Sequence, residues 1–159
     1  MPIIFDNIET QLVEALNNTL EVSHRSDFCV GYFNLRGWKQ VATNIDRWSG
    51  EDDNRCRLLV GMQKLPQELI RDFFSFRDEE TMDMQEAHKI KRELAQQFKD
   101  QLTFGIPTEA DEIGLRKLSK QIKDKKVIVK LFLRHSLHAK LYLLFRHDKI
   151  NPIIWLLGQ

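Results

Sequence analysis

Short runs of apolar residues, rich in β-branched and aromatic side chains, alternate with longer stretches in which apolar residues recur every three or four positions. The short runs predict strands over about 27–34, 55–62, 127–134, 138–145 and 152–158. The longer stretches predict a helix over 8–23, a second helix that begins near Gly37, and a charged helical segment over about 66–124. Helix and strand alternate first, and three strands then follow as a meander. This order predicts a mixed α/β domain with one central β-sheet flanked by helices.

Local signals refine this prediction. In the run 55–62, the alternation places Cys56, Leu58 and Val60 on the inward side of a strand. Thr108, with Asp111 three residues later, predicts the first turn of a helix that ends in lysines. The three tryptophans fall in apolar patterns and are expected in the core or at an interface: Trp38, Trp48 and Trp155.

The bulk properties indicate one globular domain that spans residues 1–159, with the segment 66–124 as a helical insertion. A chain of 159 residues with 42% hydrophobic and 30% charged residues can bury one core. The amino-terminal residues do not resemble a signal peptide, and no apolar run is long enough to span a bilayer. Cys29 and Cys56 have no neighbouring cysteine or paired histidine, so we expect reduced thiols in a cytoplasmic protein without a membrane partner.

The end of the sequence, NPIIWLLGQ, predicts a core strand that stops one residue after Gly158. Natural domains rarely finish on a core strand without a following turn or tail. We therefore expect the chain to be truncated at its C-terminus and to be the amino-terminal fragment of a larger protein.

The stretch SLHAKLYLLF places two ionisable side chains in an apolar run. Residues two apart in a strand share one face, so His138 and Lys140 are expected on the same side, together with Tyr142. The alternate residues Ala139, Leu141, Leu143 and Phe145 are apolar and are expected to face the core. An imidazole beside an ammonium group could act on a phosphate group as nucleophile and cation. The simpler interpretation of the pair is the solvent-exposed face of an amphipathic strand.

Two segments carry a resemblance to a known family. LHAKLYLLFR, followed by an apolar strand that ends in glycine, resembles the HKD half-site of the phospholipase D superfamily. VGYFNLRGW (30–38) is similar to the early strand and turn of the phospholipase D-like domains at the N-terminus of bacterial DEAD/DEAH-type helicases. The resemblance implies a phospholipase D-like sheet, with His138 as the nucleophile that forms a phosphohistidine and Lys140 as the phosphate ligand. Gly158 would be the glycine of a Gly-x-x-Asn element, whose asparagine would fall beyond Gln159.

The sequence departs from the family pattern at one position. The family has an acid where this chain has Phe145, and Asp148 could take its place only if the following turn folds back. Arg134 and His135 border the turn before His138 and could touch a phosphate, as could Arg36 after the first strand, although solvated surface residues are the simpler interpretation. Gly31 either lets another backbone segment approach closely or marks a bulge.

The resemblance implies a metal-independent phosphodiesterase of the nuclease type that acts on nucleic acid, on DNA rather than RNA, and is attached to a helicase. It implies no cofactor and no metal, and the histidines show no spacing typical of metal ligands. A single half-site requires a homodimer to supply the second histidine, and the fragment alone is expected to be inactive. Two alternatives stay open: a catalytically silent module that binds nucleic acid or dimerises a helicase, and a plain structural domain.

Overall fold

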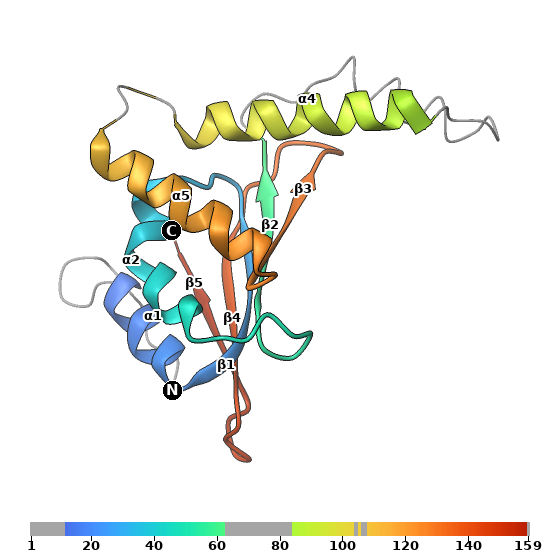
Figure 1. The fold of residues 1–159 in the computed structure, drawn as a ribbon. Coiled ribbons are helices and arrows are strands. Elements are labelled where there is room, and N and C mark those ends of the chain that lie inside the picture. Colours follow the sequence, from blue (N-terminus) through green and yellow to red (C-terminus); the bar gives the residue numbers. More distant parts are fainter. Residues whose placement is uncertain (1–11, 63–83, 104, 106–107, 159) are drawn as a thin grey trace.

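The computed structural model describes residues 12–62, 84–103, 105 and 108–158, and within them five strands form one mixed sheet. The expected mixed α/β architecture is therefore confirmed (Figure 1). Residues 66–83 of the expected helical segment and residues 8–11 of the expected first helix lie outside the described residues. The strands are β1 Ser23–Val30, β2 Cys56–Gly61, β3 Val127–Phe132, β4 Lys140–Arg146 and β5 Ile153–Leu157. The helices are α1 Leu12–Glu21, α2 Leu35–Asp46, α4 Met84–Leu102 and α5 Glu109–Lys123.

The strand order is β3-β2-β1-β4-β5, which corrects one expectation. β1, β2 and β3 are parallel, whereas β4 pairs antiparallel with β1, and β5 pairs antiparallel with β4. The last three strands therefore do not form a meander, because only β4 and β5 are joined as a hairpin. β3 follows a helical crossover from β2 and so lies parallel to it, on the far edge of the sheet.

One face of the sheet is packed against helices. Figure 1 shows α1, α2 and α5 on the same side of the sheet, with α4 across one end of it. The core residues of each strand share the parity that faces these helices, and Cys56, Leu58 and Val60 are all buried, as expected. Trp38 and Trp48 are also buried in this core.

Within the described part of the chain, nothing covers the other face of the sheet. Leu141, Leu143 and Phe145 are only half-buried there, and Trp155 on the edge strand is 60% exposed, so of its two expected places, core or interface, the core is excluded. The Arg25 guanidinium lies 4.0 Å from the centroid of the Phe145 ring on this face. Both crossovers from β1 to β2 and from β2 to β3 place their helices on the same side, and this leaves the second face open.

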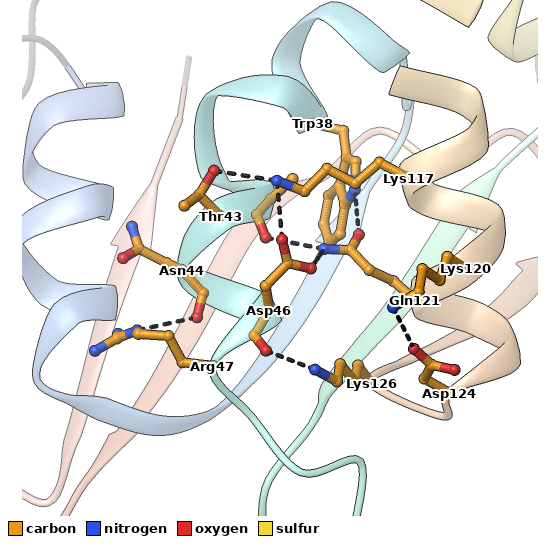
Figure 2. A network of polar contacts seen from close by, with 11 residues as sticks. Trp38, Thr43, Asn44, Asp46, Arg47, Lys117, Lys120, Gln121, Asp124 and Lys126 are labelled. Carbon is orange, nitrogen blue, oxygen red and sulfur yellow. Dashed lines mark hydrogen bonds and ion pairs between the residues drawn. The ribbon is translucent and has the colours of Figure 1, made fainter. Parts of the chain in front are cut away.

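A polar network joins α2 to α5, two of the helices that pack on the sheet (Figure 2). Gln121 of α5 is only 2% exposed, and its amide accepts a hydrogen bond from Trp38 Nε1 at 2.9 Å. The same amide donates to the carbonyl oxygen of Ala42 at 2.9 Å and to Asp46 Oδ1 at 2.6 Å. Lys117 pairs with the second oxygen of Asp46 at 2.9 Å, so the buried polar groups of this interface are satisfied.

The ends of the helices follow the chemistry of their sequences. Thr108 caps α5 in a reciprocal capping box with Asp111, as predicted. The hydrogen bonds from Thr108 and from Lys39 hold the pKa of Asp111 well below its ordinary value. In α4, Gln101 donates to the carbonyl oxygen of Gly61, and this contact places the end of that helix at the carboxyl end of β2. No helix in the described residues is long and apolar enough to cross a membrane.

Candidate functional site

The register of the sheet gathers the candidate residues at one edge. Val30, the last residue of β1, pairs with Val60 of β2 and with Lys140, the first residue of β4. The N–H of Gly158 donates to the carbonyl oxygen of Lys140 at 2.8 Å, so this glycine completes the same row. The row lies at the carboxyl ends of the parallel strands, where ligands bind in many open α/β sheets.

Two glycines let the segment before β4 approach the sheet. The N–H of Gly31 donates to the carbonyl oxygen of Ala139 at 2.7 Å, so pairing continues past the end of β1. A Cβ on Gly31 would lie 2.1 Å from the carbonyl oxygen of Leu137, and a Cβ on Gly61 would lie 2.6 Å from the oxygen of Gly31. Of the two interpretations of Gly31, close backbone approach is therefore the correct one.

A cleft of about 510 Å³ opens at this edge. Its lining includes His138, Lys140, Tyr32, Met62 and Gly158. The structure thus brings together three residues that the sequence singled out: His138, Lys140 and Gly158. His138 and Lys140 are exposed to solvent. Lys140 is the first residue of β4, and His138 lies two residues before it. A Cβ on Gly158 would lie 3.2 Å from two carbons of Lys140, so the glycine leaves room for the lysine stem.

The orientation of this pair corrects the expectation for β4. Lys140 has the parity of Leu144, which is fully buried against the helices, and of Tyr142, whose ring meets Phe28 edge-on at 5.1 Å. The apolar set that was expected to face the core points to the open face instead. Val30 and Val60 lie in the same row across the sheet as Lys140. They are buried whereas Lys140 is exposed, so the helices cover only part of this row.

Asp148 lies away from the cleft, in the turn beyond the opposite end of β4. Its Oδ1 accepts hydrogen bonds from the N–H groups of Ile150 at 2.8 Å and Asn151 at 3.3 Å, and Arg146 pairs with its other oxygen at 3.1 Å. The two backbone hydrogen bonds lower the pKa of this carboxyl group. The turn does not fold back, so Asp148 does not replace the acid that is missing at Phe145.

The remaining candidates lie around the cleft rather than in it. Arg134 and His135 are exposed in the loop before His138, and the ring of His135 meets Phe132 edge-on at 4.8 Å. Arg36 is exposed in the first turn of α2. None of the three lines the cleft among the described residues. Nor do any three His, Cys, Asp or Glu side chains in the described ranges come close enough together to hold a metal ion.

Sequence reasoning missed Tyr32 and Met62 as parts of the site. Both fall near the ends of strands that were expected to be buried, over 27–34 and 55–62, and a buried strand gives no reason to single out its last residues. The available signal was the parity of the strands, because Tyr32 is two residues beyond Val30 and Met62 two beyond Val60.

Comparison of the chain with protein-family models finds no model that matches it, and comparison with curated proteins finds no significant match either.

Proposed function

We propose that the cleft is a phosphodiester-binding half-site of the phospholipase D type, and that the protein cleaves nucleic acid through a phosphohistidine. The observation that carries the proposal is the convergence of His138, Lys140 and Gly158 on one cleft, although Gly158 is distant from the other two in sequence. An imidazole and an ammonium group, both exposed and both lining one cleft, are the minimum that such chemistry requires.

In this proposal an imidazole nitrogen of His138 attacks the phosphorus atom of the substrate. A P–N bond forms while the P–O bond to the leaving oxygen breaks, and that oxygen takes a proton from a second histidine. Water then attacks the phosphohistidine, returns its proton to the second histidine, and releases His138. Lys140 balances the negative charge of the five-coordinate transition state. The second histidine is supplied by another copy of the chain in a symmetric dimer.

The test is cleavage of labelled DNA in the presence of EDTA by the full-length protein. The His138→Ala variant should lose activity by on the order of 10³-fold or more, because it lacks the nucleophile. His135→Ala is the matched control, since this histidine is exposed in the same loop but does not line the cleft. Equal cleavage by wild type and His138→Ala, or no cleavage by either, would refute the catalytic proposal.

A catalytically silent module that binds nucleic acid is the second candidate. The observation that favours it is the position of the acids: Phe145 occupies the motif position and lies beneath Arg25, while Asp148 is engaged in a distant turn. Such a module would still bind DNA, and its affinity would fall steeply with rising salt concentration. Binding without cleavage by the full-length protein, with His138→Ala unchanged in both assays, would establish this candidate.

A further inference from the structure

Tyr32 and His138 both lie just beyond the paired ends of β1 and β4. Phe28 pairs with Tyr142 and Val30 pairs with Lys140. The hydrogen bond from the N–H of Gly31 to the oxygen of Ala139 extends this register by one residue. Tyr32 follows Gly31 and His138 precedes Ala139, and both residues line the cleft.

The ring of Tyr32 is not used by the core. Ser26, Phe28 and Val30 share its parity and are all buried, whereas Tyr32 is 45% exposed. Tyr32 lines the same cleft as His138 and Lys140, so an exposed aromatic residue accompanies the groups that would hold a phosphate. Met62, which is 5% exposed, directly follows β2 and adds an apolar residue to the lining of the cleft.

We propose that Tyr32 stacks on an unpaired base, and that the cleft therefore takes single-stranded nucleic acid in preference to duplex. This inference rests on the proposed binding of a phosphodiester at His138 and Lys140. A base in a duplex is stacked between its neighbours and cannot present its face to a side chain, whereas a base in a single strand can. Every base has a π-face, so stacking on Tyr32 selects for strandedness rather than for sequence.

The proposal implies a graded series of variants at position 32. Tyr32→Ala removes the ring and should weaken single-strand binding about tenfold, since alanine substitution of a base-stacking residue costs about 1–3 kcal/mol. Tyr32→Phe and Tyr32→Trp keep an aromatic face and should bind within about twofold of wild type, because stacking does not need the hydroxyl group. Binding of a duplex, which contacts the protein through its phosphates alone, should be unchanged by Tyr32→Ala.

The experiment measures binding by fluorescence anisotropy in EDTA, with the 159-residue protein and three labelled probes. The probes are a ten-residue oligothymidylate, the same strand with abasic residues in place of thymidines, and a duplex of ten base pairs. Trp155→Ala is the matched control, because Trp155 is an exposed aromatic residue on the opposite face of the sheet. Circular dichroism establishes that each variant is folded.

The expected result is tighter binding of the oligothymidylate than of the abasic strand or the duplex, with the difference lost in Tyr32→Ala and kept in Trp155→Ala. Equal binding of all three probes, or an unchanged affinity of a folded Tyr32→Ala variant, would overturn the proposal. Failure of catalysis gives a different pattern. Single-strand binding that depends on Tyr32, together with no cleavage by the full-length protein, removes the enzyme and leaves the stacking role. Cleavage that depends on His138 but not on Tyr32 supports the enzyme and overturns the stacking role of Tyr32.

Discussion

Replacement of Gly31 by alanine tests how the sheet positions His138. An ideal Cβ on Gly31 would lie 2.1 Å from the carbonyl oxygen of Leu137, although real Cβ atoms essentially never come within 3.0 Å of such an atom. The segment that carries His138 must therefore move by about 1 Å, and the hydrogen bond from the N–H of Gly31 to Ala139 must lengthen or break. Overpacking of this kind costs about 1–3 kcal/mol of folding free energy. A displacement of about 1 Å at a reacting group can also cost about 10²-fold in rate.

Replacement of Gly37 by alanine is the control, because it should not destabilise the protein. It lies in the first turn of α2, and a Cβ there would meet only the side-chain oxygen of Asn34, at 3.4 Å. Its backbone φ is not positive, so Gly37→Ala should be neutral or should stabilise the protein by up to about 1 kcal/mol. Urea unfolding measures both variants, and an amide NMR spectrum locates the shifts, which should centre on residues 137–140 for Gly31→Ala alone. If Gly31→Ala is as stable as Gly37→Ala and leaves those amides unshifted, the close approach of the two segments is refuted.

Two further predictions concern the core and the far end of the sheet. Gln121→Leu leaves the Trp38 indole N–H buried without a partner. Urea unfolding should therefore show that the free energy of unfolding falls by about 1–3 kcal/mol, and a decrease of less than about 0.5 kcal/mol would contradict the assigned network. Burial and the stacked ring of His147, with centroids 4.0 Å apart, lower the pKa of His24, an effect that Arg25 reinforces and Asp53 opposes. Because the pKa of His24 is lower in the folded protein than the value near 6.5 of the unfolded chain, the unfolded chain binds this proton first as the pH falls. The free energy of unfolding therefore decreases as the pH drops below 6.5. The melting temperature should therefore decline between pH 7 and pH 5, and less steeply in His24→Phe; equal slopes would exclude His24 as the cause.

Periodicity was sufficient for the type and order of the elements in the described residues, although β1 spans Ser23–Val30 rather than 27–34. The alternation in 55–62 identified Cys56, Leu58 and Val60 as inward residues, and all three are buried. The spacing of Thr108 and Asp111 identified the start of α5, because a capping box involves only residues within one turn. The period of a strand also predicted a shared face for His138 and Lys140, but β4 begins only at Lys140, and the two residues meet at the cleft at the start of that strand.

The strand order and the covered face of β4 depended on contacts between distant segments. An alternating strand defines two sets of side chains, and with Leu141, Leu143 and Phe145 in one set and Tyr142 and Leu144 in the other, hydrophobicity alone chose the wrong set. The choice is made by the positions of α1, α2 and α5, which all pack on one side of the sheet.

The sequence by itself determined the type and order of the strands and helices in the described residues, and that an imidazole and an ammonium group lie two residues apart at the start of β4. Only the tertiary structure decided that Gly158 and Tyr32 lie beside that pair, because the antiparallel pairings of β4 with β1 and β5 bring together rows that the chain itself separates. The tertiary structure also placed Asp148 away from the cleft, because Asp148 follows the C-terminal end of β4 whereas Lys140 lies at its N-terminal end. The physical reason is that periodicity is a property of neighbours along the chain, whereas a site is a property of neighbours across the sheet.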